Sequence, residues 1–417
     1  MFQKTTFDNG VRLVTESLPH AYSVSLGLWV EVGSRDEEPE LGGVSHLIEH
    51  MAFKGTAQLT ALDIARVIDR LGGQANAFTG KESTCFHARA LASHLPEMFS
   101  VLSEIFLHPA YDPAELERER QVILQEISCV EDTPDELVHV LFGLDFWPGH
   151  PLGRPILGTT ASVEGMDRQA ILDYMGANYV PANMVISAVG QLEHEHLVEL
   201  LGPVVGALPT RPARPPRHAP LTEPRLRVVS RPTEQVHVLL GADAPSAVAP
   251  QRFAAALMNG MLGGSMSSRL FQEVRERRGL AYAVYSYLSS YSDTGMLGVY
   301  LGVSPSRTVE AIQVVKEEMA AMASGLVDAE ELEHAKEHLK GSILLGAENP
   351  DSRMSRLAKN EFYFGGHVPL DQVIANIDAV EAAEVSALAG QILDPDRLAV
   401  TVLGNLDADR VAQELLA

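Results

Sequence analysis

An internal repeat constrains the fold of this chain more than any other feature of its sequence. The segment Ala182–Leu192 (ANMVISAVGQL) resembles Asp396–Leu406 (DRLAVTVLGNL), and their matching glycines lie 214 positions apart (404 − 190 = 214). A second pair, Asp112–Glu117 and Asp328–Glu333, lies 216 positions apart (328 − 112 = 216). Each similarity is short enough to arise by chance, but the nearly equal offsets predict one ancestral fold that was duplicated.

A proline-rich segment separates two halves of similar length. Residues 209–217 read Pro-Thr-Arg-Pro-Ala-Arg-Pro-Pro-Arg, and Pro220 and Pro224 follow. Proline disfavours both helix interiors and central strands, so we expect a linker here. The chain is then predicted to consist of a first domain over residues 1–208, a linker over 209–224 and a homologous second domain over 225–417.

Each half mixes expected strands with expected helices. Strands often follow one another directly, which favours an α+β fold of two α/β-sandwich domains over a strictly alternating parallel fold. From hydrophobic periodicity we expect strands over residues 11–15, 24–32, 236–241 and 296–303, and helices over 62–71, 93–107, 252–261 and 308–323.

The composition is that of a globular protein with an acidic charge balance. Apolar residues make up 46% of the chain, enough for a sizeable core, and the formal net charge is −23. Nucleic acids and anionic membranes are bound by basic patches, so we expect neither as a partner. The acidic charge fits a solvated surface or, alternatively, a chamber that attracts basic peptides. The sequence leaves both open.

The terminus and the cysteines bear on the cellular compartment. Met1–Asp8 lacks the apolar stretch of a signal peptide, and no run of about 18 uncharged apolar residues occurs elsewhere. Two cysteines, Cys85 and Cys129, suit a reducing compartment and offer neither a disulfide framework nor a cysteine-based zinc site. We therefore expect a cytoplasmic protein in which any metal is bound through nitrogen and oxygen.

The segment His46-Leu47-Ile48-Glu49-His50 is the first candidate for chemistry. Histidines four residues apart lie on one face of a helix, one turn apart, where both rings can bind a single ion. Glu49 lies beside them and can serve as a base for a metal-bound water. The alternative is a surface helix with two exposed histidines, because a catalytic zinc site needs a third protein ligand.

A carboxylate-rich helix is expected from Asp112 to Ile127. Asp112 precedes Pro113, which is a favourable start for a helix, and Glu119 and Glu126 lie nearly two turns apart on one face. Such a pair can supply a metal ligand and a carboxylate that supports the metal shell. The alternative is a salt-bridged surface helix, since arginines flank both sides of Glu119.

These residues resemble the pitrilysin family of metallopeptidases, the inverzincins, which include insulin-degrading enzyme and the mitochondrial processing peptidase. The pattern His-x-x-Glu-His is the inverzincin signature. In that family the third ligand is a glutamate 76 positions beyond the second histidine, which matches Glu126 (126 − 50 = 76). A further family glutamate lies seven residues earlier, at Glu119. The resemblance implies the LuxS/MPP-like metallohydrolase fold.

The resemblance covers most of the chain. Val32–Glu37 (VGSRDE) is a family-like segment ahead of the motif, and Gly72–Thr79 (GGQANAFT) follows it. In relatives the latter forms a strand edge near the metal, where substrate adds as a further strand, so Asn76 and Ala77 are expected to bind the peptide backbone. The segment could equally be only a turn that enters a strand.

The second half matches the family at Gly263–Phe271 (GGSMSSRLF) and Arg275–Tyr282 (RERRGLAY). Similar enzymes use an arginine and a tyrosine seven residues apart to hold the substrate carbonyl and stabilise the oxyanion, and Arg275 and Tyr282 fit that spacing. The alternative is a helix that ends at Gly279, with Arg275 in its last turn where a cation interacts well with the helix dipole.

The resemblance also limits the prediction. No second His-x-x-Glu-His occurs, and Ser342 stands where the repeat offset would place an equivalent of Glu126, so only the first half can hold metal. The length matches the short subfamily, in which two subunits enclose a chamber, which implies a homodimer or a heterodimer with a related subunit. Phe86 stands where many relatives have tyrosine, so no polar role is expected there.

The predicted function is a zinc-dependent endopeptidase that acts on peptides or unstructured polypeptides. The resemblance implies that His46, His50 and Glu126 bind one Zn2+, that Glu49 is the general base and that Glu119 orients the shell. One alternative is a catalytically silent subunit of a processing complex, although such relatives usually lose metal ligands or the base, whereas this chain keeps them. A non-peptidase hydrolase on the same site is a further alternative.

Overall fold

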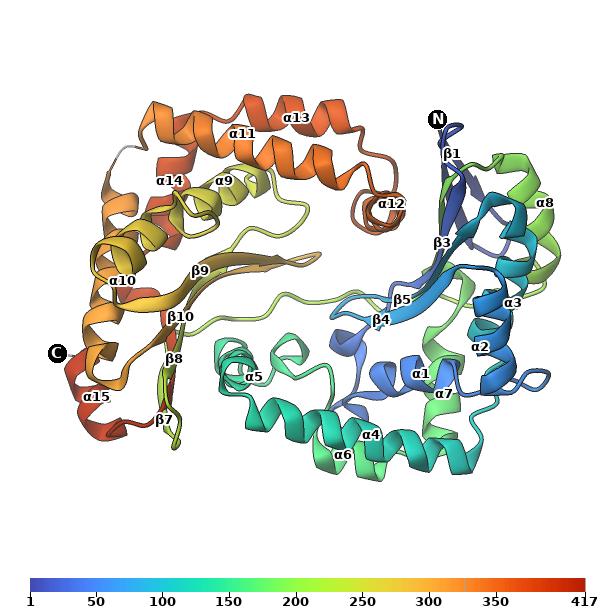
Figure 1. The fold of residues 1–417 in the computed structure, drawn as a ribbon, viewed down its shortest axis with the longest axis horizontal. Coiled ribbons are helices and arrows are strands. Elements are labelled where there is room, and N and C mark those ends of the chain that lie inside the picture. Colours follow the sequence, from blue (N-terminus) through green and yellow to red (C-terminus); the bar gives the residue numbers. More distant parts are fainter. Residues whose placement is uncertain (326, 417) are drawn as a thin grey trace. The chain divides into compact units, whose positions relative to one another are not determined.

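The computed structural model describes residues 1–325 and 327–416, and within them the chain forms two compact units (Figure 1). The first unit contains Met1–Ser128, Arg154–Pro216 and Leu345–His367. The second contains Cys129–Gly153, Arg217–Leu344 and Val368–Ala417, apart from the two residues outside the described ranges. Each unit combines one mixed sheet with helices on both faces.

The first unit is built on a six-stranded sheet with the order β1-β2-β6-β3-β5-β4. Strands β2 and β6 are parallel, and the other neighbouring pairs are antiparallel. Strand β4 lies at one edge and pairs with β5 alone. The strands are β1 (Phe2–Thr6), β2 (Arg12–Ser17), β3 (Ser23–Val30), β4 (Gln74–Thr79), β5 (Thr84–Leu91) and β6 (Met184–Gly190).

One face of this sheet packs against helices of the first half of the chain. Leu26 and Phe86 of the sheet share a buried core with Ile48, Leu102 and Ile171 of the helices. This packing seats the helix with the His-x-x-Glu-His motif directly on the sheet. The helices are α1 (Val44–Ala52), α2 (Ala61–Arg70), α3 (Leu95–Leu107), α4 (Pro113–Asp132), α6 (Thr160–Gly165), α7 (Arg168–Asn178) and α8 (His194–Val205).

The second unit repeats the same topology with one strand fewer. Its sheet order, β7-β11-β8-β10-β9, corresponds strand by strand to β2-β6-β3-β5-β4, and β11 pairs parallel with β7 as β6 does with β2. The repeated sequence segments form β6 and β11, so the predicted α+β duplication is confirmed. The strands are β7 (Leu226–Ser230), β8 (Val236–Ala244), β9 (Ala281–Ser290), β10 (Gly295–Val303) and β11 (Ala399–Gly404).

Helices of the second unit cover its sheet in the same way. The expected helices 252–261 and 308–323 are found as α9 and α10. The helices are α5 (Pro134–Phe146), α9 (Arg252–Leu262), α10 (Thr308–Ser324), α11 (Ala329–Gly346), α13 (Leu370–Asp378), α14 (Ala382–Ile392) and α15 (Ala408–Leu416), and a π-helix covers Phe271–Arg277. Short 3₁₀ turns lie at Ser34–Asp36, Pro39–Leu41, Ala92–His94, Pro151–Gly153, Pro181–Asn183, Pro305–Arg307 and Pro395–Arg397.

The two halves of the sequence exchange one helix with each other. Helix α12 (Pro350–Phe364) comes from the second half but packs on the first sheet, where Met354 and Leu357 join a buried cluster with Trp29. Helix α5 comes from the first half but packs on the second sheet, around Phe142. Their first residues are 216 positions apart (350 − 134 = 216), so the exchanged helices are equivalent members of the repeat.

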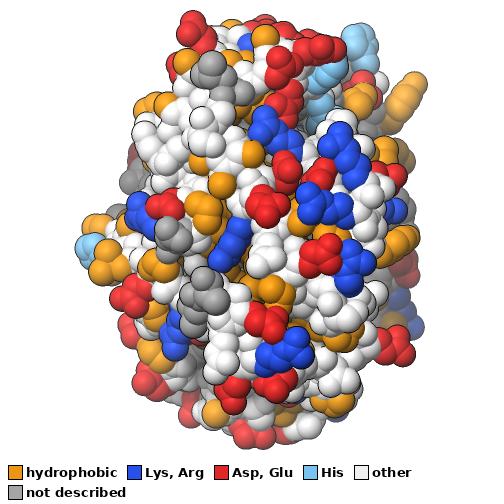
Figure 2. Space-filling model, turned by 90° about the vertical axis from the view of Figure 1, so that its left-hand side faces the viewer, with side chains coloured by type: hydrophobic (Ala, Val, Ile, Leu, Met, Phe, Trp, Pro, Cys, Tyr) orange, Lys and Arg blue, Asp and Glu red, His pale blue; other side chains and the backbone are white. Residues whose placement is uncertain are grey.

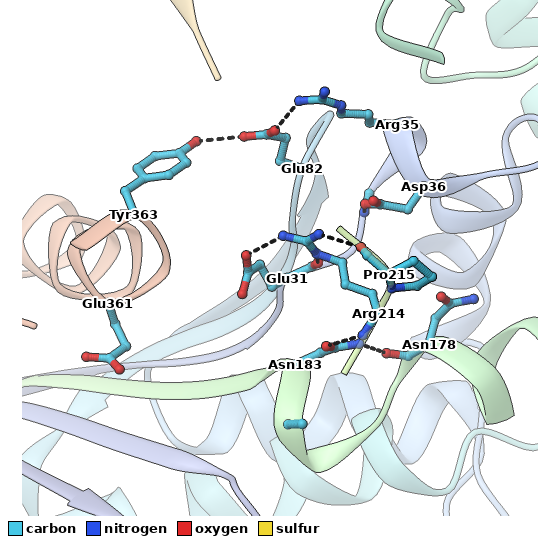
Figure 3. Close-up of polar contacts among 12 residues, drawn as sticks. Glu31, Arg35, Asp36, Glu82, Asn178, Asn183, Arg214, Pro215, Glu361 and Tyr363 are labelled. Atoms are coloured by element: carbon cyan, nitrogen blue, oxygen red, sulfur yellow. Dashed lines mark hydrogen bonds and ion pairs between the residues drawn. The ribbon is translucent and has the colours of Figure 1, made fainter. Parts of the chain in front are cut away.

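Polar contacts also hold α12 in the first unit (Figure 3). The Tyr363 hydroxyl donates to Glu82 at 3.2 Å, and Arg35 donates to the other oxygen of the same carboxylate at 2.7 Å. Arg214, within the proline-rich segment, donates to the backbone and side chain of Glu31 at 2.9 and 2.6 Å. Residues 206–225 contain neither helix nor strand, and the expected linker lies within them.

On the face shown in Figure 2, acidic side chains are spread over the whole view, with lysine and arginine side chains between them. That face therefore carries ordinary solvated charge. Within the described residues, no helix is both long and apolar enough to cross a membrane.

We expect the exchanged helix to stabilise the first unit. Leu357→Ala should lower its free energy of unfolding by about 2–5 kcal/mol, because truncating a buried leucine leaves a cavity. The chain has two tryptophans, so in a Trp147→Phe background the fluorescence of Trp29, next to α12, reports the first unit alone. Leu345→Ala is the matched control, since Leu345 is 70% exposed. Equal losses in both variants would contradict the prediction.

Candidate metal centre

Helix α1 begins with an unusual cap. Gly43 has a left-handed backbone (φ 91°), and a Cβ atom there would lie 2.5 Å from the Leu157 carbonyl oxygen, so only glycine fits. Glu37, six residues before Gly43, supplies the missing acceptor: its two carboxylate oxygens accept from the backbone N–H groups of Gly43 at 2.8 Å and Ser45 at 2.9 Å. A carboxylate at this end of a helix is also favoured by the helix dipole.

The Glu37 carboxylate is buried and interacts with the cation of Lys81. Burial raises its pKa, while the two backbone hydrogen bonds and Lys81 oppose the rise. Burial lowers the pKa of Lys81 to about 8, and the charge of Glu37 opposes that change. Arg154 donates to the Glu37 carbonyl oxygen at 2.9 Å and accepts from the Lys81 ammonium group through its own carbonyl. These contacts fix where α1 starts.

The two histidines of α1 meet a glutamate of α4. The ring centres of His46 and His50 lie 4.5 Å apart. The Nε2 atom of each ring is 3.7 Å from a different oxygen of the Glu126 carboxylate. One donor atom from each of the three residues lies within 4.8 Å of the others. The structure therefore brings together the three residues that the sequence predicted as ligands.

The donors suit a divalent metal such as zinc. Burial, and to a smaller extent the neighbouring His50, lower the pKa of His46 to about 4, so the His46 ring is neutral with a lone pair at neutral pH. His50 Nδ1 lies 3.1 Å from a Glu119 oxygen, and a carboxylate there requires Nδ1 to carry the hydrogen. The His50 Nε2 lone pair is then directed at Glu126. Two imidazoles and one carboxylate are a donor set found at catalytic zinc sites.

Glu119 has the supporting position predicted from the sequence. It is buried, and its carboxylate also binds the Lys54 ammonium group at 2.7 Å. The helix that carries it starts as expected, because Asp112 accepts from the N–H groups of Ala114 and Glu115. Glu119 faces the histidines, with its Oε2 atom 3.1 Å from His50 Nδ1.

Glu49 lies next to the three donor residues His46, His50 and Glu126 but is not one of them. Its Oε2 atom accepts from the Thr79 hydroxyl at 2.7 Å. Burial raises the pKa of Glu49, and the charge of Glu126 adds to this, while Thr79 and His50 oppose it. A partly buried carboxylate beside a metal-binding group is placed to take a proton from a water molecule held there.

Strand β4 leaves one edge of the sheet unpaired, as expected for residues 72–79. Asn76 is exposed, and its side-chain oxygen accepts from the Ala77 N–H at 2.8 Å. The Ala77 N–H is therefore hydrogen-bonded to the side chain of the preceding residue and not to another strand. An edge of this kind can pair with another extended chain. Phe86 in the adjacent strand is buried against Phe106, which fits the absence of a polar role.

Arg275 and Tyr282 lie together in the second unit. The helix that the alternative interpretation expected before Gly279 is present as a π-helix with Arg275 in its last turn, and π-helices are a rare form that often marks functional sites. The Arg275 guanidinium lies 4.7 Å from the centre of the Tyr282 ring and 4.8 Å from that of Phe271. Tyr282 is 78% exposed. The structure therefore places the two predicted oxyanion residues side by side within one unit.

Three features of these sites were not predicted. Glu37 and Thr79 each end a family-like segment, but neither segment indicates the contacts that these two residues make with α1. A carboxylate near a helix N-terminus is favourable, but here Glu37 lies outside the first turn of α1, so the local sequence does not reveal the contact. The π-helix has no comparable signal, because its extra residue per turn does not alter the apolar pattern enough to be read.

Comparisons with known proteins agree with this architecture. Residues 12–160 match the family model described as Insulinase (Peptidase family M16), and residues 165–339 match the model described as Peptidase M16 inactive domain. A protein of Bacillus subtilis named uncharacterized zinc protease YmxG is 39% identical over 95% of this chain and 97% of its own length. The chain belongs to the M16 peptidase family. An uncharacterized zinc protease of Streptomyces coelicolor is also 39% identical, over 99% of this chain and 91% of its own length.

Solved structures confirm the M16 fold. A crystal structure of a peptidase M16 inactive domain from Pseudomonas fluorescens matches with a TM-score of 0.92 and 21% identity, over 98% of this chain and 99% of that one. A protease from Helicobacter pylori matches with a TM-score of 0.89 and 19% identity, over 97% and 99% of the two chains. The predicted family and the two-domain fold class are thus both confirmed.

We expect Glu37 to stabilise the M16 metal helix. Glu37→Ala should lower the free energy of unfolding by roughly 2–4 kcal/mol, because hydrogen bonds to a charged group contribute about 1.5–3 kcal/mol each. Glu37→Gln keeps one acceptor oxygen and should lose less. Denaturant unfolding measures both, with the exposed neighbour Glu38→Ala as the control. A Glu37→Ala loss no larger than the control's would be inconsistent with this cap.

Proposed function

We propose that this M16 protein is a zinc-dependent endopeptidase. The proposal rests chiefly on one observation: donor atoms of His46, His50 and Glu126 converge, and the Glu49 carboxylate lies beside them. The relatives named zinc protease support the same metal. When bound, zinc supplies a Lewis acid that brings the pKa of a water molecule near neutrality.

The residues of the chain then have separate tasks. Glu49 takes a proton from the water and later delivers it to the leaving amine, which requires a carboxylate that is close but does not ligate. Glu119 holds His50 in the tautomer whose Nε2 faces Glu126. Such supporting carboxylates keep metal ligands oriented.

The edge of β4 is the proposed binding site for the peptide. An extended substrate pairs there through its main chain, so Asn76 and Ala77 bind backbone groups and many sequences are accepted. The Ala77 N–H becomes available once the Asn76 side chain turns away from it. Short or unstructured chains are the favoured substrates, because only an extended segment can add to a strand edge.

Arg275 and Tyr282 are the proposed donors to the substrate carbonyl. A guanidinium and a phenol in contact offer a cation and a hydroxyl donor, which suit the charge that develops on the carbonyl oxygen. Because the second unit supplies them, cleavage would need both halves of the chain. The second half lacks a metal motif of its own, in line with the family model called inactive domain.

The wider setting is also part of the proposal. Two chains, identical or related, would enclose a chamber in the cytoplasm, and neither nucleic acid nor a membrane would be a partner. The free cysteines Cys85 and Cys129 suit a reducing compartment. A catalytically silent subunit is the rival function, but the presence of all three ligands and of Glu49 favours the peptidase.

Incubation of the purified chain with a mixed peptide library tests the function directly. We expect cleavage that a chelator abolishes and zinc restores, read by mass spectrometry of the products. The same spectra give the residue preference around each cleaved bond. Binding of peptides with no cleavage in the presence of zinc would favour the silent subunit.

The roles of Glu49 and Glu126 separate in a pair of variants. Glu49→Gln should keep about one zinc per chain and lose more than 10²-fold in kcat, because it removes the base and no ligand. Glu126→Gln should lose most of the zinc together with the activity. Metal analysis and peptide cleavage measure both, and exposed Glu40→Gln serves as control. Full turnover by Glu49→Gln would contradict the assignment of Glu49 as the general base.

Glu119 is expected to act on the metal through His50. Glu119→Gln should weaken zinc binding by about 10–100-fold, as is usual when a carboxylate behind a metal-binding histidine is lost. Competition with a fluorescent chelator measures the affinity without any need for activity. Glu115→Gln, in the same helix and paired with Arg118, is the matched control. Unchanged affinity in Glu119→Gln would refute this role.

A further inference from the structure

A single hydroxyl lies between the edge strand β4 and the metal helix α1. Thr79 is the last residue of β4, and its Oγ1 atom lies 2.7 Å from Glu49 Oε2 and 3.2 Å from the Ser45 carbonyl oxygen. Ser45 lies four residues before Glu49 in α1, so the hydroxyl reaches both the side chain of Glu49 and the backbone of the same helical turn.

The chemistry of a hydroxyl suits this position. Thr79 has one hydrogen to donate, and the Glu49 carboxylate is the nearer and the more strongly charged of its two acceptors. The Ser45 carbonyl already accepts the Glu49 backbone N–H by helix geometry. A hydroxyl can also accept a hydrogen bond, so it can remain bonded to Glu49 when that group holds a proton, by donating to Ser45 instead.

Within the part of the chain that the structure describes, the hydrogen bonds to the Glu49 side chain come from Thr79, through its hydroxyl at 2.7 Å and through its backbone N–H. A glutamate has several rotatable bonds, and a base must stay within hydrogen-bonding reach of the water that it activates. The hydroxyl of Thr79 therefore selects one arrangement of the carboxylate next to the ligands.

The position of Thr79 along β4 links it to the proposed peptide-binding edge. Side chains two residues apart in a strand point to the same face, so Thr79 shares a face with Ala77, which is buried. The backbone of Thr79 is held by its pairing with Thr84 in β5. A peptide that adds to the edge at Asn76 and Ala77 orders the same short strand that carries the hydroxyl.

We propose that Thr79 is a positioning residue that couples substrate pairing on β4 to the orientation of the base Glu49. This inference rests on the proposed endopeptidase function, and it adds a residue that acts through Glu49 without touching the reacting atoms. Strand pairing and base alignment are then one event. A peptide that binds without pairing to β4 would leave Glu49 without the correct orientation.

Two variants of Thr79 test this coupling. Thr79→Val keeps the shape and removes the hydroxyl, so kcat should fall by about 10–100-fold, since small misplacements of catalytic groups cost up to about 10²-fold. KM and zinc content should change little, because the edge and the ligands are intact. Thr79→Ser restores the hydroxyl and should recover most of kcat. Wild-type kcat in Thr79→Val, or no recovery in Thr79→Ser, would overturn the proposal.

A control in the neighbouring strand separates positioning from stability. Thr84 is buried, and its hydroxyl donates to the Val32 carbonyl oxygen at 2.9 Å. Thr84→Val removes a comparable hydrogen bond from the strand paired with β4 and leaves the Thr79–Glu49 contact in place. It should lower the melting temperature without reducing kcat of the folded fraction. An equal fall of kcat in Thr84→Val would assign the Thr79 effect to stability and overturn the proposal.

A structural measurement keeps the two proposals distinguishable. Crystal structures of the zinc-loaded wild type, Thr79→Val and Thr79→Ser should show the Glu49 carboxylate displaced in the valine variant alone. If the wild type cleaves no peptide, the endopeptidase function fails, yet these structures still decide the role of Thr79. An unmoved Glu49 in Thr79→Val would overturn the positioning role even in an active enzyme.

Discussion

The buried carboxylate of Glu37 is the interaction on which the metal centre depends. It accepts from the first N–H groups of α1, where Gly43 leaves no room for a side chain. Because a helix is nearly rigid over nine residues, fixing its first turn also fixes the directions of His46, Glu49 and His50. The backbone hydrogen bonds from Gly43 and Ser45 and the cation of Lys81 offset part of the cost of burying this charge. The chemistry of the site therefore depends on a residue that touches none of the ligands.

Much of this architecture could be predicted from the sequence because the decisive signals are periodic or local. The spacing of His46 and His50 indicates one helical face, and the Asp112-Pro113 start locates the helix that supplies Glu119 and Glu126. The repeat offset predicted two related sheets, and β6 and β11 occupy equivalent places in them. Boundaries differed by a few residues, as at β3, which ends at Val30 rather than residue 32.

Other features depend on contacts that no local pattern encodes. An amphipathic helix indicates that one face is buried but not which sheet covers it, so the exchange of α5 and α12 was not foreseen. The proline-rich segment marks the boundary between the two sequence repeats. The boundaries of the two compact units differ from it, because each unit includes a helix from the other half of the sequence. The sequence indicated only that Thr79 belongs to a strand. Its hydrogen bond to Glu49 was not predicted, because it joins residues 30 positions apart.

The exchange of helices also has a consequence for the order in which the protein is made. A chain emerges from the ribosome from its amino terminus, and domains generally fold as they appear. The first sheet and the three proposed metal ligands emerge early, but one face of that sheet, around Trp29, stays uncovered until α12 is made, which begins at Pro350 of 417 residues. During that interval an apolar surface stays open to water. Synthesis of this M16 protein thus includes a delay, in which the first unit cannot finish folding until most of the second repeat has been made.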